Sequence, residues 1–351
     1  MPKTFEIAGR KIGPGHPTYV IAEISANNNG SLERTKDLIT RAKNAGADAV
    51  KIQTYTADTM TIEHDGPGFV VEDGPWKGRH LHELYDKAHM PWEWHAPLFE
   101  HAKAVGITLF STPFDTTAVE LLERLNAPAY KIASFELTDI PLISAVARTG
   151  KPMIMSTGMA NREEIADAVN AAKAANASGI VLLHCVSGYP SLPRESNLRN
   201  IENLANTFGV AAGLSDHTLG SAVSVAAAAL GANVIEKHFT LRRADGGEDS
   251  HFSLEPEEFK RLCEEVRQGW EAIGKVTFEK QASESGHADY RRSLYVVENI
   301  AAGEPFTSRN VRAIRPGFGL APKHYDQVMQ STAAVDLSRG TPLKLEHLRS
   351  K

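Results

Sequence analysis

Two histidines stand at corresponding places in neighbouring strand–helix units of this sequence. His217 ends the segment Gly-Leu-Ser-Asp-His at 213–217, and His238 ends Val-Ile-Glu-Lys-His at 234–238. The stretch 219–231 between them is rich in small residues and predicts one helix, so one strand–helix unit separates the histidines. Two neutral imidazoles at adjacent strand ends could bind one divalent cation and leave most of its coordination positions open. The alternative is a pair of partly buried histidines that form ordinary hydrogen bonds.

Polar side chains also follow the other apolar runs, at the points where strands are predicted to end. Two lysines and several hydroxyls suit an anion with many acceptor oxygens, because lysine supplies charge and hydroxyls supply directed hydrogen bonds. One small molecule with a phosphate and a carboxylate would use all of them. Each hydroxyl could instead cap a turn or a helix, and the lysines could pair with Glu23 or Glu136. The strand-end residues are Glu23, Asn27, Lys51, Gln53, Ser111, Thr112, Lys131, Ser134, Glu136, Ser156, Thr157, Ser187, Tyr189, Ser215, His217, Glu236 and His238.

The elements that position these residues alternate between short apolar runs and helical patterns. The apolar runs are 19–24, 49–52, 108–110, 129–132, 153–155, 180–183, 210–214 and 234–235, and the helical patterns include 31–45, 116–125, 162–175, 221–230 and 256–273. Eight strands with helical crossovers predict a (β/α)8 TIM barrel, and the first turn lacks the GxGxxG sequence of a dinucleotide-binding sheet. The carboxyl ends of barrel strands share one face, where substrates bind. The long segment 55–91, with turns at 66–68 and 74–76, is the predicted cover of that face.

The alternation stops after Gly274. The polar residues that follow are typical of a linker, with a frayed helix as the alternative. Short strands and many turns then predict a small domain with a core of its own, which we expect to rest on a partner surface. The expected organisation is a barrel domain at 1–278, a linker at 279–290 and a C-terminal domain at 291–351.

Composition narrows the classes of partner. The chain has 351 residues, of which 42% are hydrophobic, and a net charge of -5 without a basic block, which argues against a nucleic-acid partner. Cys185 and Cys263 are too few for a disulfide framework. Residues 1–14 lack the apolar region of a secretion signal, and no apolar run approaches the roughly 18 residues that span a bilayer. We therefore expect a cytoplasmic protein that binds small molecules and no membrane.

Several of these segments resemble the N-acylneuraminate (sialic acid) synthases and their bacterial relatives. The motifs stand at 22–27, 51–55, 110–114, 130–134, 156–159, 184–185, 213–217 and 236–240. The resemblance reaches the C-terminus, where Arg-Ser-Leu-Tyr at 292–295 and Ile-Arg-Pro-Gly at 314–317 are similar to the antifreeze-like, or SAF, domain of that family. Together these motifs are specific, although each one alone is weak.

Within the family, further segments resemble the pseudaminic acid synthase branch more than the sialic acid branch. These segments are 51–56, 84–95, 248–254 and 315–323. The chain departs from the sialic acid branch at Val-Ser-Gly-Tyr-Pro, 186–190, where Ser187 replaces an asparagine. A serine can also bind an anion by its hydroxyl.

The resemblance implies a transferase that condenses phosphoenolpyruvate with 2,4-diacetamido-2,4,6-trideoxy-L-altrose and water. The products would be pseudaminic acid and phosphate, formed by C–O cleavage. His217 and His238 would hold Mn²⁺, Mg²⁺ or Co²⁺, and Glu23 would orient or deprotonate the attacking water. The phosphate and carboxylate would be held by Lys51, Thr112, Lys131, Ser134, Ser156, Ser187 and Ser215. The sugar hydroxyls would be contacted by Gln53, Glu136, Tyr189 and Asp249. Arg315 would reach the acylamino group from the SAF domain of a partner chain, in a domain-swapped homodimer.

Other functions are compatible with the same residues. An N-acetylneuraminate or legionaminate synthase would use another amino sugar. A metal-independent aldolase would use Lys51, Lys131 or Lys237 as a Schiff-base nucleophile. A noncatalytic sugar-binding protein would use the barrel as a scaffold and the C-terminal domain as an ice-binding module, which the many charged strand ends disfavour.

Overall fold

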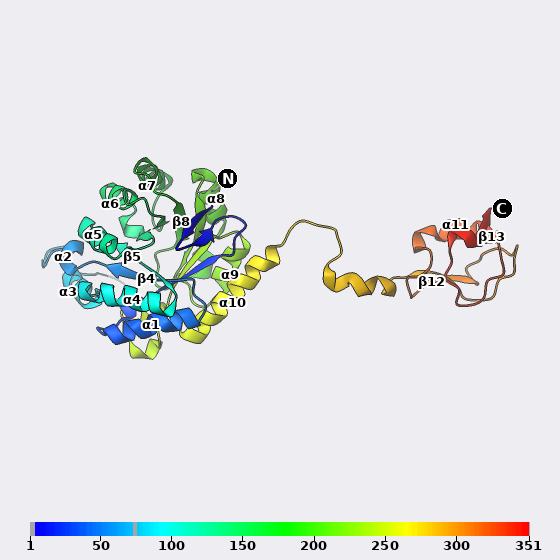
Figure 1. The fold of residues 1–351 in the computed structure, drawn as a ribbon, viewed down its shortest axis with the longest axis horizontal. Coiled ribbons are helices and arrows are strands. Elements are labelled where there is room, and N and C mark those ends of the chain that lie inside the picture. Colours follow the sequence, from blue (N-terminus) through cyan, green and yellow to red (C-terminus); the bar gives the residue numbers. More distant parts are fainter. Residues whose placement is uncertain (1–3, 73–75, 351) are drawn as a thin grey trace. The chain divides into compact units, whose positions relative to one another are not determined.

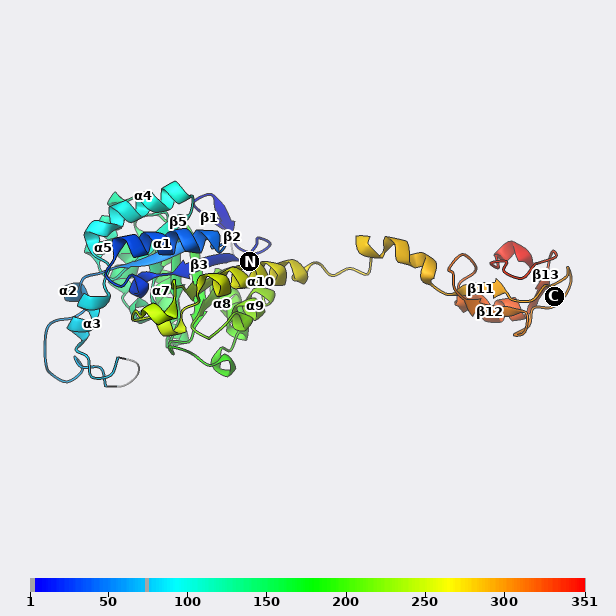
Figure 2. The ribbon, with the colours of Figure 1, turned by 90° about the horizontal axis from the view of Figure 1, so that it is seen from below.

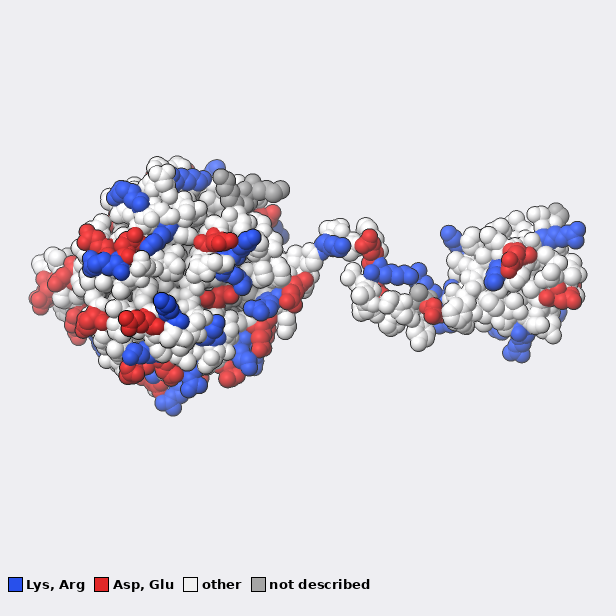
Figure 3. All heavy atoms as spheres, in the orientation of Figure 1, with Lys and Arg blue, Asp and Glu red and all other residues white. Residues whose placement is uncertain are grey.

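The computed structural model describes residues 4–72 and 76–350. It divides into two compact units, Met1–Gly274 and Lys275–Lys351. Residues 74 and 75 of the predicted turn at 74–76 lie outside the described residues. No helix among the described residues combines the length and the apolar character needed to cross a membrane. On the visible face of the first unit, lysines and arginines are interspersed with acidic residues (Figure 3).

Within the described part of the first unit, eight parallel strands form a closed barrel surrounded by helices (Figure 1), which confirms the predicted TIM-barrel fold. Each strand pairs with the next along the chain, and the last pairs with the first through His238 opposite Glu23. The strands are β3 (Tyr19–Glu23), β4 (Ala49–Thr54), β5 (Thr108–Pro113), β6 (Tyr130–Ile132), β7 (Met153–Ser156), β8 (Ile180–Cys185), β9 (Ala211–Asp216) and β10 (Val234–His238).

Helices follow the strands and cover the outside of the barrel. Several begin where a side chain accepts a backbone hydrogen bond, as Ser31, Asp115 and Asn161 do. The helices are α1 (Leu32–Asn44), α4 (His95–Val105), α5 (Thr116–Arg124), α6 (Ile140–Ala147), α7 (Arg162–Ala174), α8 (Arg199–Phe208), α9 (Ala222–Ala229) and α10 (Pro256–Ile273). The last has the predicted bounds.

Most strands extend further toward their carboxyl ends than predicted. The apolar run of the last strand ended at residue 235, whereas β10 ends at His238. The prediction stopped at the first charged residue, but inward-facing polar residues at the carboxyl face remain in the hydrogen-bonded ladder.

Side chains inside the barrel change from apolar to polar along the strands. Alternate residues of a strand point to the same side. Near the amino ends, the inward positions form one buried apolar cluster of Tyr19, Ile21, Ala49, Phe110, Ala129, Ile154, Val181, Leu183, Ala211 and Val234. An unpredicted hairpin, β1 (Phe5–Ile7) and β2 (Arg10–Ile12), adds Ile7 and Ile12 to this cluster. The barrel is therefore filled from its amino end, and the polar positions are left to the other end.

One glycine is required by the close approach of two strands. A Cβ atom on Gly213 of β9 would lie 2.1 Å from the carbonyl oxygen of Val234 on β10. Any larger residue would separate these two strands, which carry His217 and His238 at their ends.

The segment 55–91 contains two short helices, α2 (Ala57–Met60) and α3 (Leu81–Ala88). Figure 2 shows them at the end of the barrel opposite the hairpin β1–β2. They therefore lie at the carboxyl face, as predicted for a cover.

The second unit has its own hydrophobic core. Strand β11 (Ser293–Val296) pairs with β12 (Val311–Ile314), and β13 (Ser331–Ala333) pairs with β14 (Leu348–Ser350). With α11 (Tyr325–Met329), these elements enclose Leu294, Val296, Ile300, Phe306, Val311, Val328, Ala333, Leu337 and Leu343. Most of the predicted linker forms a 3-10 helix, Ala282–Tyr290, so the helical alternative describes it better than an open linker.

Candidate active site

A cavity of about 330 Å³ opens at the carboxyl ends of the barrel strands. Its cover includes Trp76, Leu84 and Tyr85 of the segment 55–91, which places this segment over the site as predicted. Most predicted site residues line the cavity, namely Glu23, Lys51, Gln53, Lys131, Ser134, Glu136, Ser156, Tyr189, Ser215, His217, His238 and Asp249. Thr112 lies beneath them, because it accepts a hydrogen bond from Lys51 Nζ at 3.1 Å. Arg315 belongs to the second unit, where it is exposed.

Four buried charges form the floor of the cavity, and we call them the charge cluster: Glu23, Lys51, Lys131 and Glu236. Lys51 Nζ contacts Glu23 Oε2 and lies 3.9 Å from Glu236 Oε1. Lys131 Nζ donates to the same Glu236 oxygen at 3.0 Å. None of these four residues is more than 4% exposed. The predicted alternative of ion pairing therefore holds for Lys51 and Glu23, but Lys131 pairs with Glu236 and not with Glu136.

Burial and pairing shift the pKa values of this cluster in different directions. Burial raises the pKa of Glu236, but Lys131 and Lys51 outweigh it and lower the pKa to about 2. Burial lowers the pKa of Lys51, and two carboxylates more than compensate, so its pKa is raised. For Lys131, burial and the repulsion of Lys51 outweigh Glu236, and the pKa is lowered. An anionic ligand in the cavity would therefore raise the pKa of Lys131 and favour its charged form.

Hydroxyl groups converge beside the lysines. The backbone N–H of Gly158 donates to Ser134 Oγ at 3.1 Å. A Cβ atom on Gly158 would lie 2.3 Å from Ser187 Oγ and 2.7 Å from Ser134 Oγ, so a glycine is needed for the two hydroxyls to meet here. Ser156 Oγ is buried and has no hydrogen-bond partner. An oxyanion in the cavity would give this hydroxyl a partner.

The two histidine rings lie side by side at the ends of neighbouring strands, with ring centroids 5.4 Å apart. His217 Nδ1 donates to the carbonyl oxygen of Val186 at 3.0 Å, so in the neutral imidazole Nε2 carries the lone pair that can bind a cation. His238 Nδ1 lies 3.3 Å from Asp249 Oδ2 without forming a hydrogen bond. Two imidazoles with carboxylates nearby are a donor set that suits Mn²⁺, Mg²⁺ or Co²⁺. No group of three or more His, Cys, Asp or Glu side chains is arranged to hold a metal among the described residues.

Aromatic and acidic side chains define the rest of the cavity. The Tyr189 ring lies 4.4 Å from the His217 ring, and the Phe252 ring lies 4.7 Å from the His238 ring. Burial raises the pKa of Glu136 to about 7, and its Oε2 has no hydrogen-bond partner. A protonated carboxyl group can donate a hydrogen bond to a neutral polar ligand and can also accept one from it.

Two residues of the last strand differ from the prediction. Glu236 is one of the predicted strand-end residues, and it contacts both lysines, a role that the sequence analysis does not assign to it. The alternation in 234–238 contains the signal, since Glu236 and His238 must point to the same side. Lys237 points to the other side, where its Nζ donates to Asp216 at 2.8 Å. It is therefore not placed to act as a Schiff-base nucleophile in the cavity.

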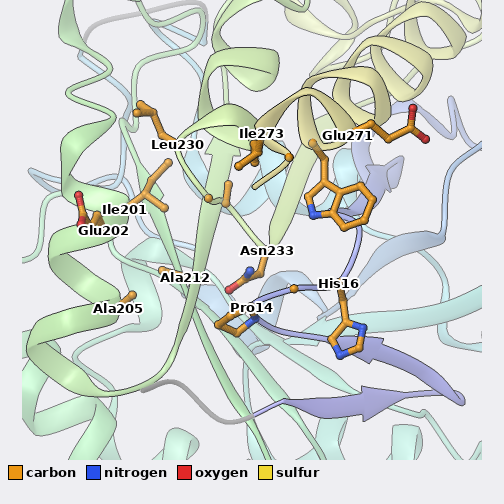
Figure 4. A pocket seen from close by; sticks show the side chains of 15 residues that line it. Pro14, His16, Ile201, Glu202, Ala205, Ala212, Leu230, Asn233, Glu271 and Ile273 are labelled. Atoms are coloured by element: carbon orange, nitrogen blue, oxygen red, sulfur yellow. The ribbon is translucent and has the colours of Figure 1, made fainter. Parts of the chain in front are cut away.

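A larger hollow of about 580 Å³ lies elsewhere on the first unit, where α8, the segment 230–233 after α9, the end of α10 and residues 14–16 meet (Figure 4). Apolar side chains such as Ile201, Leu230 and Ile273 line it, with Glu202 and Glu271 among them. None of its lining residues is a buried charged group. Volume alone does not define a reactive site, so we assign the chemistry to the smaller cavity.

Comparison with known proteins agrees with this assignment. Residues 38–278 match the NeuB family, and residues 291–349 match the SAF domain. The chain therefore belongs to the NeuB family and ends in a SAF domain, which confirms the family inferred from the motifs.

Its relatives include synthases of several nine-carbon sugar acids. A pseudaminic acid synthase of Helicobacter pylori is 42% identical over 339 residues, which cover 95% of this chain and 98% of the relative. An N,N'-diacetyllegionaminic acid synthase of Legionella pneumophila is 34% identical over 345 residues, 96% of each chain. The crystal structure of an N-acetylneuraminic acid (sialic acid) synthetase of Leptospira borgpetersenii, in complex with citrate, superposes with a TM-score of 0.74. It has 32% sequence identity and covers 83% of this chain and 97% of that one.

Proposed function

We propose that this protein condenses phosphoenolpyruvate with 2,4-diacetamido-2,4,6-trideoxy-L-altrose and water, giving pseudaminic acid and phosphate. The observation that carries the proposal is the convergence of two lysines, several hydroxyls and two imidazoles in one covered cavity. The choice of sugar is supported by the higher identity to the pseudaminic acid synthase, 42%, than to the legionaminic acid synthase, 34%.

The charge cluster and the serines bind the anionic substrate in this proposal. Phosphoenolpyruvate carries a phosphate and a carboxylate, and Lys51 and Lys131 supply fixed positive charge for them. Ser134, Ser156 and Ser187 supply hydroxyl donors. Their fixed positions favour the transition state, because charge develops on groups that already face donors.

The histidines are the proposed ligands of a divalent metal. When bound, the metal supplies Lewis-acid polarisation of the sugar aldehyde. His217 is suited to this role because the Val186 carbonyl fixes its tautomer and orients its ring. The aromatic rings of Tyr189 and Phe252 restrict the motion of both imidazoles.

Glu23 is the proposed group that orients the water and takes its proton. Its Oε1 accepts from the backbone N–H of Ser25 at 2.9 Å, while Oε2 faces Lys51. The C3 atom of phosphoenolpyruvate bonds to the aldehyde carbon, and the water oxygen bonds to C2. The proton lost by the water balances the one gained by the aldehyde oxygen. The bridging C2–O bond then breaks while the new hydroxyl group on C2 becomes a carbonyl, and phosphate leaves with the bridging oxygen and the second proton of the water.

Isotope labelling tests this order of bond cleavage. Oxygen-18 in the bridging position of phosphoenolpyruvate should appear in the released phosphate, and solvent oxygen should appear in the sugar acid. Bridging label retained in the sugar acid would require P–O cleavage and would contradict the role of Glu23. Phosphate release measured across a panel of amino sugars tests the specificity. Faster release with the N-acetylneuraminate or legionaminate precursor would replace the proposed sugar.

Chelation tests the metal. We expect EDTA to abolish turnover and Mn²⁺ to restore it, because two imidazoles alone bind a divalent ion with modest affinity. Full activity of His217→Ala or His238→Ala in metal-free buffer would exclude the assignment. Borohydride trapping of a covalent substrate adduct on Lys51 or Lys131 would favour a Schiff-base aldolase instead.

We also propose that the active assembly is a domain-swapped homodimer in which Arg315 of one chain completes the site of the other. Its planar guanidinium suits an amide carbonyl and hydroxyls. The second unit, residues 275–351, contains the SAF domain and carries 12 Lys and Arg residues against eight Asp and Glu, whereas the whole chain carries 38 against 43. This opposite charge balance would attract the second unit of one chain to the barrel of another.

The cytoplasmic location of the protein stays a prediction.

A further inference from the structure

A buried ion pair lies directly behind the two histidines. Asp216 precedes His217, and Lys237 precedes His238. Lys237 Nζ donates to Asp216 Oδ2 at 2.8 Å, and each side chain is only 1% exposed. Neither residue lines the cavity. The pair therefore cannot contact a substrate there, and its role must be exerted through its neighbours.

The register of the sheet places the pair level with the histidines. Lys237 stands opposite Asp216 in the ladder between β9 and β10. Since side chains alternate along a strand, Ser215, Glu236 and His238 face the cavity while Asp216 and Lys237 face the helices. The next residue after Asp216 returns to the cavity as His217. Each histidine is thus attached to one member of the ion pair by a single peptide unit.

The hydrogen bonds of Asp216 connect three elements. Its Oδ1 accepts from the backbone N–H of Thr218 at 2.9 Å and from the Thr218 hydroxyl at 2.7 Å. Its Oδ2 accepts from Ser224 Oγ of α9 at 2.6 Å as well as from Lys237. Lys237 also donates to the carbonyl oxygen of Thr218. The backbone on both sides of His217 is therefore held to β10 and to α9.

A fully buried ion pair gives little net stability, because desolvation offsets the attraction between the charges. Apolar residues of similar size would fill the same space between barrel and helices. What the charged pair adds is a fixed distance and direction between the two strand ends. Loss of a group that hydrogen-bonds to a metal ligand typically lowers metal affinity by about 10- to 100-fold, and Asp216 and Lys237 act on the histidines through one peptide unit instead.

We propose that Asp216 and Lys237 are positioning residues that set the separation and orientation of His217 and His238 for a divalent cation. The inference rests on the proposed function, because it requires the histidines to bind that cation. It differs from a purely structural role, which would affect folding and leave the affinity for metal unchanged.

Mn²⁺ binding followed by electron paramagnetic resonance tests the inference without measuring activity. The double variant Asp216→Asn/Lys237→Met removes both charges together and so avoids a lone buried charge. We expect it to fold, with a melting temperature near that of the wild type, and to bind Mn²⁺ about 10-fold or more weakly. The matched control is Glu123→Gln/Lys151→Met, which removes an ion pair of 2.6 Å outside the cavity and should not change Mn²⁺ affinity.

The single variant Ser224→Ala provides a second measurement if the double variant does not fold. It removes one hydrogen bond to Asp216 and keeps the ion pair, so we expect a smaller loss of Mn²⁺ affinity, about threefold. Wild-type affinity in folded variants, with or without a lower melting temperature, would overturn the inference and leave the proposed function intact. A wild-type protein that binds no Mn²⁺ would overturn the proposed metal and the inference together.

Discussion

Glu236 holds the two lysines of the cavity floor in place before any substrate binds. It lies 3.0 Å from Lys131 Nζ and 3.9 Å from Lys51 Nζ, and Ser215 Oγ donates to it at 3.4 Å. Without this carboxylate, two buried cations would share only Glu23. The two lysines and two glutamates give the cluster no net charge. An entering anion therefore meets two lysines whose charges are already balanced by Glu23 and Glu236.

We expect Glu236→Gln to reduce the free energy of unfolding by about 3–5 kcal/mol near pH 7, because a buried ion pair loses one partner. The pKa of Glu236 is lowered from 4.5 to about 2 by the lysines, which outweigh burial. The stabilisation is therefore present above pH 4.5 and is lost as the pH falls toward 2. Unfolding in urea at several pH values should show the difference from the wild type shrinking across this window. Glu120→Gln, at an exposed position, is the control.

Glu136, which also lines the cavity, provides a second test. Burial raises its pKa from 4.5 to about 7, so its ionised form is disfavoured in the folded protein. The contribution of Glu136 to the free energy of unfolding is therefore fully present below pH 4.5 and is lost as the pH rises through 7. We expect Glu136→Gln to become more stable relative to the wild type over that range. The KM for the amino sugar should vary near pH 7 in the wild type and stay flat in the variant. Parallel pH profiles for the two proteins would show that Glu136 does not titrate there.

Among the elements, the cover formed by residues 55–91 is connected to the loop after β10 by the ion pairs of Glu248. Glu248 Oε1 accepts from Arg79 at 2.8 Å and lies 3.3 Å from Lys87 Nζ of α3. Both partners belong to the segment 55–91, and Glu248 itself lines the cavity beside Asp249. The ion pairs of Glu248 therefore connect the cover to the residue next to Asp249, which is predicted to bind the sugar.

We expect Glu248→Gln to raise the KM for the amino sugar by about fivefold, because partly exposed ion pairs contribute up to about 1 kcal/mol. The KM for phosphoenolpyruvate should change less, since the lysines lie beneath the cover. Steady-state kinetics with each substrate varied in turn provides the measurement. Glu63→Gln, in the same segment but exposed, is the matched control. Equal increases in both KM values would show that the cover does not discriminate between the two substrates.

At the scale of the whole molecule, the proposed dimer predicts complementation between inactive chains. Arg315→Ala and His217→Ala should each be nearly inactive alone. If Arg315 acts on the site of another chain, a heterodimer has one site free of both lesions, and mixing should restore activity toward half of that of the wild type per heterodimer. The measurement is phosphate release after mixing, with heterodimer formation checked by differently tagged chains. Confirmed heterodimers without activity would show that each chain uses its own SAF domain.

The barrel, the family and most residues of the cavity could be predicted from the sequence alone. Hydrophobic runs and helical patterns are local properties, so their alternation was sufficient to predict eight strands and crossovers. The shared position of strand ends in a parallel barrel then placed residues as distant as Glu23 and His238 at one face, where they line one cavity, and the family resemblance added Asp249. The metal, the roles of these residues and the partner chain stay predictions.

The pairing of the buried charges and the hairpin that fills the amino end of the barrel became clear only from the folded chain. Lys131 could have paired with Glu136, four residues beyond the end of its strand, but closure of the barrel brings Glu236 from β10 to it across the interior. The hairpin β1–β2 and the helices of the cover are short, and their stability comes from packing that local patterns do not contain. Lys237 points away from the cavity because side chains alternate along β10. On that side it meets Asp216, which also accepts a hydrogen bond from Ser224 of α9. Long-range pairing in a closed barrel depends on the position of every strand, which no local segment specifies.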